Sequence, residues 1–214
     1  MPADQLLQMI HIDPEFVVVN KESGMLAVPG RGPEKKDSVA DRVRRIFPSC
    51  IKQPAVHRLD MDTSGLMVVA LTADTHRDLS RQFHERQTQK RYVALLNGVL
   101  DAECGTIELP FRLDVNNRPI QIYDEINGKM GITHWKKIAI EGNTTRVDFI
   151  PVTGRTHQLR VHASHAKGLG IPIVGDPFYG DGSGPGQLKL HACELTFTHP
   201  KTGETMSYRS EPSF

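Results

Sequence analysis

The stretch His57-Arg58-Leu59-Asp60-Met61-Asp62-Thr63-Ser64-Gly65-Leu66 leads directly into an apolar run that ends at Leu71. Such a run predicts a buried strand. Ordinary turns favour Gly, Pro, Asn and Ser, whereas the eight residues that precede Gly65 carry an imidazole, a guanidinium, two carboxylates and two hydroxyls. The pattern fits either a polar turn that caps a buried strand or a carboxylate placed beside a cation for chemistry.

The elements on either side of this strand follow from apolar periodicity and turn residues. Upstream, two short strands at 16–20 and 26–28 are expected to be joined by a turn, and a helix with Ser38 and Asp41 in a capping box follows them. Downstream, Thr72 is expected to cap a second helix that carries a basic run. Further strands are expected at 92–96, 132–140, 146–150, 190–198 and 204–208, with a third helix from Thr156 to Gly168. Because hairpins outnumber β-α-β units, the expected fold class is α+β, with a mainly antiparallel (mixed) central sheet and flanking helices.

Composition limits the class of protein. The chain has 214 residues, 38% of them hydrophobic, which is enough for the core of one large or two small domains. Lysine and arginine number 26 against 25 acidic residues, so the total charge argues neither for nor against a polyanionic partner. The three cysteines include no C-x-x-C pair, which disfavours a disulfide framework or a zinc ribbon and fits a reducing, cytoplasmic location. The N-terminal segment lacks a signal-peptide pattern, and no run is long enough to span a bilayer.

Two other kinds of site can be weighed against the sequence. The residues 62–65, Asp-Thr-Ser-Gly, are close to the aspartic-protease signature, but the glycine stands one position late and no second copy supplies the paired carboxylate. His157, His162 and His165 cluster in one segment, yet no acidic residue lies near His162 and His165 to complete a metal-binding set. Packed or surface histidines explain that cluster better than a metal site does.

The segment 153–160, Thr-Gly-Arg-Thr-His-Gln-Leu-Arg, differs in kind from an ordinary turn. It delivers two arginines, a glutamine and a threonine to the end of a strand, a turn and the start of a helix. Such a turn is suited to hold an anion or a carboxylate. An arginine within hydrogen-bonding range favours the ionised form of an aspartate. The segment could therefore supply the counter-charge for Asp60, and this would favour a nucleophile over a general acid.

Five motifs occur in order along the chain: HRLDMDTSGL at 57–66, KRYVALL at 90–96, TGRTHQLRVH at 153–162, GDPFYG at 175–180 and LHA at 190–192. Together they resemble the motif set of the RluA family of pseudouridine synthases, from about Phe16 to the C-terminus. The resemblance implies a single catalytic domain over 1–214, with its core at about 16–214. The first expected strand begins within twenty residues of Met1, so no S4 RNA-binding domain is expected before it. The segment VPGRGPEKKDSV at 28–39 most resembles the family type that modifies both a tRNA anticodon loop and 23S rRNA.

The resemblance implies a reaction and a set of roles. The family isomerises uridine to pseudouridine, which requires no redox partner, nucleotide or metal, so no cofactor is expected. The catalytic Asp maps onto Asp60, its ion-pair partner onto Arg155 and the residue that stacks on the target base onto Tyr92. Arg58 matches the residue that fills the place of an extruded base. His57, Thr63 and Gln158 are expected to position the substrate, and Arg77, Arg81, Lys90 and Arg91 to contact RNA phosphates.

Two alternatives remain open at this point. A non-catalytic RNA-binding or RNA-remodelling protein could keep the same fold for its affinity, and Asp60 distinguishes the two readings. A hydrolase that uses the carboxylate and the histidines is the third reading. No obvious dimerisation helix is present, so a monomer is the default expectation. The sequence leaves open which uridines are modified, whether the route is covalent or passes through a glycal, and what His191 does.

Overall fold

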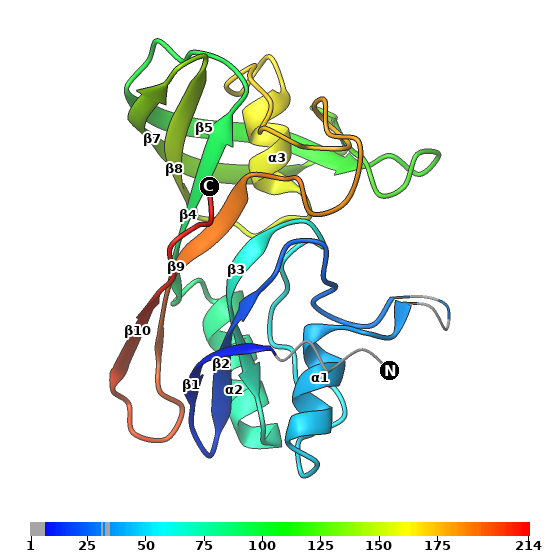
Figure 1. Ribbon diagram of the computed structural model, residues 1–214, viewed down its shortest axis with the longest axis vertical. Helices are drawn as coiled ribbons and strands as arrows, with labels where there is room; N and C mark the ends of the chain where they lie inside the picture. The colour runs from blue at the N-terminus through cyan, green and yellow to red at the C-terminus, as the bar shows by residue number, and fades with distance from the viewer. Residues whose placement is uncertain (1–6, 31, 33–34) are drawn as a thin grey trace. The chain divides into compact units, whose positions relative to one another are not determined.

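The computed structural model describes residues 7–30, 32 and 35–214, and the described residues form ten strands and three helices. Figure 1 shows their arrangement. The first six residues of the N-terminal segment lie outside the described part, as do Arg31, Pro33 and Glu34 of the segment 28–39. The chain divides into two compact units: a first unit of Met1–Gln89 with Ala192–Pro212, and a second unit of Lys90–His191 with Ser213–Phe214.

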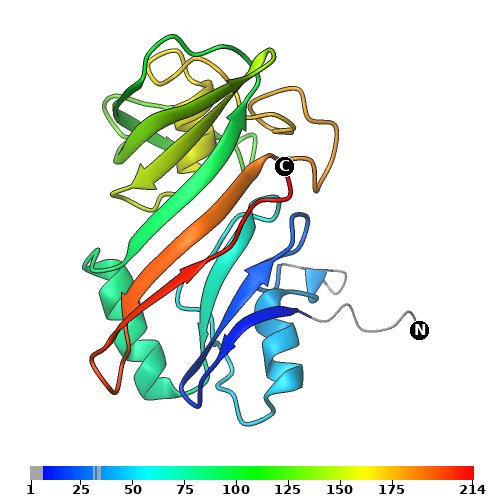
Figure 2. The same ribbon diagram turned by 60° about the vertical axis from the view of Figure 1, so that its left-hand side comes forward.

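The strands of the first unit pair antiparallel. β2 pairs with β1 on one side and with β3 on the other, and β9 pairs with β10 through residues 194–198. Figure 2 shows β9 in orange and β10 in red running side by side as a hairpin. The bounds are β1 Gln8–Ile12, β2 Phe16–Lys21, α1 Val39–Ile46, β3 Ser64–Ala70, α2 Ala73–His84, β9 Leu190–Thr198 and β10 Thr205–Arg209.

The strand that follows the motif 57–66 lies at the centre of the first unit. All its residues from Gly65 to Ala70 are buried, so both faces are covered and the sequence shows an unbroken apolar run instead of an alternating one. One face packs with α2 through Leu79. The core on that face consists of Phe16, Val18, Leu66, Val68, Ala70, Leu79, Leu195 and Phe197.

Both helices of the first unit begin where the sequence predicts. The Ser38 side chain accepts a hydrogen bond from the Asp41 backbone N–H at 3.2 Å, and the Thr72 side chain accepts one from the Thr75 N–H at 3.4 Å. Each side-chain oxygen satisfies an N–H group that the first turn of a helix leaves without a partner. The two predicted N-caps are therefore confirmed.

The expected strand at 26–28 is wrong. Only an isolated bridge joins Leu26 to Ser38, and the strands beside β2 are β1, which the sequence analysis missed, and β3. The reason lies in the first turn of α1. The N–H groups of Val39 and Ala40 donate to the carbonyls of Leu26 and Ala27 at 2.9 and 3.1 Å. These carbonyls satisfy helix N–H groups instead of a strand partner.

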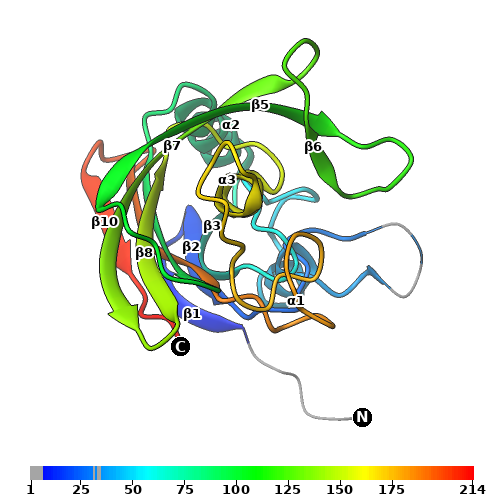
Figure 3. The same cartoon turned by 90° about the horizontal axis from the view of Figure 1, so that it is seen from above.

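The second unit is an antiparallel sheet in the order β4-β8-β7-β5-β6 with one helix. Figure 3 shows α3 lying within the curve of β5, β7 and β8. Its core combines β-strand residues such as Phe111, Trp135 and Phe149 with Leu159 and Val161 of α3. The bounds are β4 Gln89–Leu96, β5 Cys104–Leu113, β6 Gln121–Tyr123, β7 Lys129–Glu141, β8 Thr144–Pro151 and α3 Gln158–Ser164.

The predicted hairpin around Glu141-Gly142-Asn143 is confirmed, whereas the sequence analysis missed β5 and β6. The third helix is shorter than expected at both ends. His157 has φ 56° and ψ 17°, the left-handed conformation, so the helix begins only at Gln158. It ends at Ser164, because His165 is extended. The expected fold class, α+β with a mainly antiparallel sheet, is confirmed.

Candidate active site

The loop 57–63 of the first unit carries Asp60 on an anchored backbone. Leu59, Asp62 and Thr63 are buried, Asp60 is half-buried and Arg58 is exposed. The Thr63 N–H donates to the Asp60 carbonyl at 3.2 Å, which closes the turn. Asp60 and Arg58 thus remain accessible on a loop that Leu59, Asp62 and Thr63 fix in the protein.

Lys21, at the end of β2, binds the backbone of this loop. Its side chain is 1% exposed, and its Nζ donates to the carbonyls of Glu22, Met25 and Met61 at 2.9, 2.8 and 2.8 Å. Three acceptors match the three N–H groups of an ammonium. Burial lowers the pKa of Lys21 to about 7, against the attraction of the nearby carboxylates of Asp62, Asp60 and Glu22.

Two further bonds join the same turn to the loop. The Gly24 N–H donates to the Met61 carbonyl at 3.0 Å, and the Ser23 hydroxyl donates to the Asp62 carbonyl. Together with Lys21, the turn after β2 therefore binds the backbone on the C-terminal side of Asp60. The sequence pattern marks Lys-Glu-Ser-Gly only as the end of a strand, and gives no signal of a buried ammonium there.

Gly65 is required where the loop enters β3. Its φ is +116°, and a Cβ at this position would lie 2.4 Å from the carbonyl oxygen of Ala192. Any side chain would force the loop away from β9.

His57 anchors the start of the loop. Its Nε2 accepts the Val68 N–H of β3 at 3.1 Å, and its ring stacks on Phe83 of α2 with centroids 4.3 Å apart. Because the backbone N–H is the donor, Nε2 carries no hydrogen. These contacts give His57 a role in holding the loop, and its expected contact with substrate stays a prediction.

In the second unit, the turn 153–157 presents Arg155, which is exposed. Gln158, only 4% exposed, holds this turn: its Oε1 accepts the Arg155 N–H at 3.0 Å and the Thr153 hydroxyl at 2.7 Å. Its Nε2 donates to the Ile132 carbonyl and the Thr133 hydroxyl of β7 at 3.0 and 2.9 Å. Gln158 thus fixes the backbone of Arg155 to the sheet, while its expected RNA contact remains a prediction.

The second arginine of this segment, Arg160, is held in a buried ion pair. Arg160 is 1% exposed and makes a bidentate ion pair with Asp176, which is fully buried, at 2.8 and 2.6 Å. Asp176 belongs to the GDPFYG motif, and its Oδ1 also accepts the N–H groups of Phe178 and Tyr179. Of the two arginines, Arg155 is therefore the one that the turn exposes.

Strand β4 places three of the expected residues on alternating faces. Lys90 and Tyr92 share one face and Arg91 lies on the other, because side chains alternate along a strand. A Cβ on Gly154 would lie 3.9 Å from the Lys90 Nζ, so Lys90 lies beside the turn that presents Arg155. Burial lowers the pKa of Lys90. Arg91 forms an ion pair with Asp148 of β8 at 2.8 Å.

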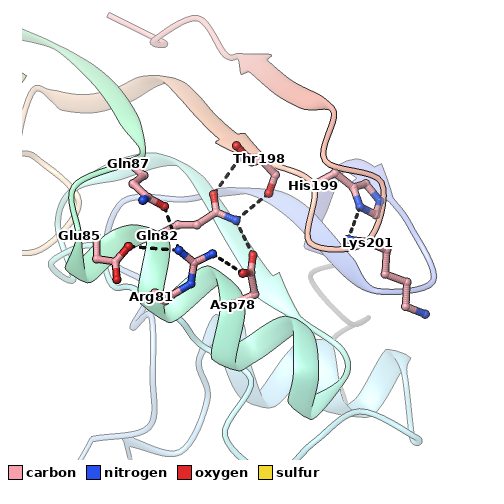
Figure 4. A network of polar contacts seen from close by, with 8 residues as sticks. All are labelled: Asp78, Arg81, Gln82, Glu85, Gln87, Thr198, His199 and Lys201. Atoms are coloured by element: carbon pink, nitrogen blue, oxygen red, sulfur yellow. Dashed lines mark hydrogen bonds and ion pairs between the residues drawn. The ribbon is translucent and has the colours of Figure 1, made fainter.

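The basic residues of α2 are balanced by carboxylates on the same helix. Figure 4 shows Arg81 bridging Asp78 and Glu85, with distances of 2.6 and 3.1 Å. Arg77 pairs with Asp74 at 3.0 Å. Any phosphate bound by these arginines would have to compete with exposed ion pairs, which are individually weak.

His162 and His165 pack against aromatic rings. His162 is fully buried with its ring edge-on to Phe111, and burial lowers its pKa to about 4. His165 stacks on Tyr123 with centroids 5.2 Å apart. His191 is 3% exposed. Over the part of the chain that the structure describes, no group of three His, Cys, Asp or Glu residues is arranged to hold a metal ion. None of the described helices is long and apolar enough to cross a membrane.

Comparison with known proteins identifies the class. Residues 15–165 match the family model described as RNA pseudouridylate synthase. The chain belongs to this family of RNA-modifying isomerases, which confirms the resemblance and the enzyme class predicted from the motifs.

The particular relatives are close over their whole length. A protein of Haemophilus influenzae described as dual-specificity RNA pseudouridine synthase RluA is 45% identical over 217 residues, which cover 100% of this chain and 96% of that protein. The protein of the same description from Escherichia coli strain K12 is 43% identical with the same coverage. Human RNA Pseudouridylate Synthase Domain Containing 1 superposes with a TM-score of 0.76 at 30% identity, over 97% of this chain and 84% of that one. Human RNA Pseudouridylate Synthase Domain Containing 4, at 23% identity and a TM-score of 0.73, shares the fold over 96% of this chain and 88% of its own.

Proposed function

We propose that this enzyme acts on specific uridines of two structured RNAs, a tRNA anticodon loop and 23S rRNA. The observation that supports this substrate range most is the 45% identity, over the full chain, to a relative whose description is dual-specificity. The motif 28–39 supports the same type. The alternative, an RNA-binding protein without activity, lacks support because both the family and these relatives are described as synthases.

The proposed reaction conserves all atoms of the nucleotide. The N1–C1′ glycosidic bond breaks, the base turns, C5 bonds to C1′, and the proton on C5 is removed while N1 gains one. Asp60 acts as the nucleophile at C1′ or as the carboxylate that stabilises positive charge there, as carboxylates do in glycoside cleavage. A route through a glycal uses the same residue to take part in removing a sugar proton.

Contacts within the first unit support a catalytic role for Asp60. A nucleophile must be ionised and must be held in place. The buried Lys21 ammonium lies close enough to attract the Asp60 carboxylate, and it binds the carbonyl of the next residue, Met61. The loop therefore offers both a favourable charge and a fixed backbone.

The remaining roles are assigned through the family motifs. Arg155 is the ion-pair partner of Asp60, and Tyr92 stacks on the target base and helps to move the C5 proton. Arg58 fills the place that the extruded base leaves, for which a planar guanidinium is suited. His57, Thr63 and Gln158 keep the reacting groups in position. Phosphate contacts are assigned to Arg77, Arg81, Lys90 and Arg91.

We further propose that the two units act together as one catalytic domain over 1–214, and that the enzyme works as a monomer in the cytoplasm. The alignment covers 96% of a relative that is described as an enzyme in its own right, which supports a single catalytic domain. No cofactor is proposed, as the family resemblance implies, because the proposed reaction transfers no electrons to or from a partner and takes up no group.

The test is to incubate the purified enzyme with unmodified transcripts of whole tRNAs and of 23S rRNA fragments, and then to map pseudouridine by its carbodiimide adduct. We expect carbodiimide adducts at one uridine of the anticodon loop and at one or a few uridines of the rRNA fragments. Modification of only one of the two RNAs would overturn the dual substrate range, and modification of neither would overturn both proposed substrates.

A further inference from the structure

The backbone of His157 adopts a conformation that is uncommon for residues other than glycine. With φ 56° and ψ 17°, it lies in the left-handed region, which only a few per cent of non-glycine residues occupy, although asparagine, aspartate and histidine are found there more often than the rest. Such a conformation persists only where the surroundings hold it. His157 stands two residues after Arg155 and directly before α3, so its backbone angles join the turn that carries Arg155 to the helix.

The contacts that hold His157 come from the GDPFYG motif. The ring stacks on Phe178 with centroids 5.6 Å apart and an interplanar angle of 16°, and it meets the ring of Tyr179 edge-on at 5.6 Å. The Tyr179 hydroxyl lies 2.9 Å from His157 Nδ1. The His157 side chain makes no capping bond to α3. These ring contacts hold the His157 side chain in place. They therefore also stabilise the left-handed backbone of His157.

The hydrogen positions follow from a fixed donor. The backbone N–H of Gln121 in β6 donates to the Tyr179 hydroxyl oxygen at 2.7 Å. That oxygen accepts from Gln121, and we infer that its own hydrogen is donated to His157 Nδ1. With Nδ1 accepting, the ring hydrogen of a neutral His157 sits on Nε2. The hydroxyl thus connects β6 to the turn through two hydrogen bonds.

Tyr179 is itself firmly seated. Asp176 Oδ1 accepts the N–H groups of Phe178 and Tyr179 at 2.9 and 3.1 Å. The guanidinium of Arg160, held by Asp176, lies over both rings at 5.1 and 5.4 Å from their centroids. Arg160 lies on α3, the helix that directly follows His157. The GDPFYG motif therefore contacts the turn through His157 and the helix through Arg160.

We propose that Tyr179 is a positioning residue for pseudouridine formation: its hydroxyl fixes the left-handed turn at His157 and so the direction of Arg155. The inference rests on the proposed role of Arg155 in the reaction. Phe178 and Arg160 supply the platform, and the hydroxyl of Tyr179 supplies the directional contact. No sequence motif alone assigns this task, because the three contributing segments are separate in the chain.

Tyr179→Phe is the direct test. The variant keeps the ring, and with it the contacts to Arg160 and His157, but removes both hydroxyl bonds. A misplacement of catalytic groups by about 1 Å typically costs about 100-fold in rate. We expect kcat on an RNA substrate to fall about 10- to 100-fold, while KM changes less than about 3-fold because the phosphate contacts are untouched. An unchanged kcat would overturn the proposal.

Tyr123→Phe is the matched control. Tyr123 belongs to β6, as Gln121 does. Its ring stacks on His165, and its hydroxyl oxygen accepts a hydrogen bond from Lys167 Nζ at 2.9 Å. Its partners, Lys167 and His165, lie outside the turn 153–157, so removal of its hydroxyl tests a generic loss of one tyrosine bond in the same unit. We expect wild-type kcat within about 2-fold. An equal loss in both variants would show that a general loosening of the unit is responsible, and would overturn a specific role of Tyr179.

A double-variant comparison separates this proposal from the assignment of Arg155. If Arg155→Ala retains wild-type kcat, the proposed role of Arg155 fails. If Arg155→Ala is impaired and Tyr179→Phe is not, only the positioning proposal fails. We expect the variant with both substitutions to be no slower than Arg155→Ala alone, because Tyr179 acts through Arg155. Multiplying losses would mean that Tyr179 acts by another route, and would overturn the proposal.

A spectroscopic measurement on the wild type does not depend on the folding of any variant. In ¹⁵N-labelled protein, with the signal assigned through a His157 variant, Nδ1 of His157 should show the chemical shift of an unprotonated acceptor and Nε2 that of an N–H group. A hydrogen on Nδ1 would contradict the proposed direction of the bond from Tyr179 and overturn its role.

Discussion

At the scale of single residues, the most consequential feature is the buried ammonium of Lys21. Three carbonyls surround it, and one of them belongs to Met61, the neighbour of Asp60. Charge patterns along the sequence do not reveal such a residue, because a lysine after a strand normally lies in solvent. The structure shows instead a buried amine, with its pKa lowered to about 7, that binds the loop of the proposed nucleophile.

Lys21→Met tests the importance of this support. The substitution keeps the length and the apolar body of the side chain but leaves three carbonyls without their donor, at a cost of about 1–3 kcal/mol for each group that stays buried and unpaired. We expect the loop to loosen and kcat to fall at least about 10-fold. Single-turnover rates and urea unfolding should be measured together.

Lys137→Met serves as the control for Lys21. Lys137 of β7 donates to the carbonyls of Leu100 and Asp101, both at 3.0 Å, but lies in the second unit and supports no expected catalytic residue. Its variant should lose some stability and keep its kcat. A Lys21→Met enzyme with wild-type turnover would show that the ammonium is not needed to hold Asp60.

His162 makes stability depend on pH. Burial lowers its pKa to about 4, below the value of 6.5 for an exposed histidine. Between these values the unfolded chain binds a proton that the folded chain excludes, so stability is full above the higher value and is lost as the pH falls towards the lower one. We expect His162 alone to cost about 2 kcal/mol between pH 7 and pH 5.

The contribution of His162 is measured by urea unfolding of the wild type and of His162→Leu at pH 7 and at pH 5. The leucine variant should lose this part of the pH dependence while it keeps an apolar side chain against Phe111. If both proteins lose the same stability on acidification, His162 is not the titrating group.

At the scale of elements, the sequence predicts best where burial is simple. The run 66–71 is apolar because both faces of β3 are covered, and the N-caps of α1 and α2 are local contacts. β5 was missed, although its core residues alternate with polar ones as in a half-buried strand, because Pro110 interrupts the run. The segment 26–28 was predicted as a strand because its apolar residues fit one, and only the contact with α1 shows otherwise.

The helix α2 carries a prediction at this scale. If its arginines contact phosphates, Arg81→Gln should weaken RNA binding and reduce the slope of log affinity against log salt concentration by about 0.7–0.9. The ion pairs with Asp78 and Glu85 would be exchanged for phosphate contacts on binding. Filter binding over a salt series is the measurement. Arg146→Gln, which breaks an ion pair with Glu141 on the hairpin of the second unit, should leave the slope unchanged. An unchanged slope for Arg81→Gln would remove α2 from the RNA-binding surface.

At the scale of the whole molecule, ordered motifs were more informative than composition. A net charge of +1 neither indicates nor excludes an RNA partner, and the arginines of the local basic run on α2 are ion-paired. The motifs identified the family, which the comparisons confirm, because each motif keeps residues with a structural task, such as Asp176 for Arg160. The pairing of those residues could not be predicted, since it depends on contacts between segments that periodicity does not relate.

The central claim is that the Asp60 carboxylate performs the chemistry, and one measurement tests it most directly. Wild-type enzyme and Asp60→Asn should be incubated with the same unmodified transcripts, with pseudouridine mapped by carbodiimide and RNA affinity measured by filter binding. We predict no detectable pseudouridine with the asparagine variant and an RNA affinity within about 3-fold of wild type, because the substitution keeps the size of the side chain and removes only its charge. Pseudouridine formed at the wild-type rate by Asp60→Asn would contradict the account.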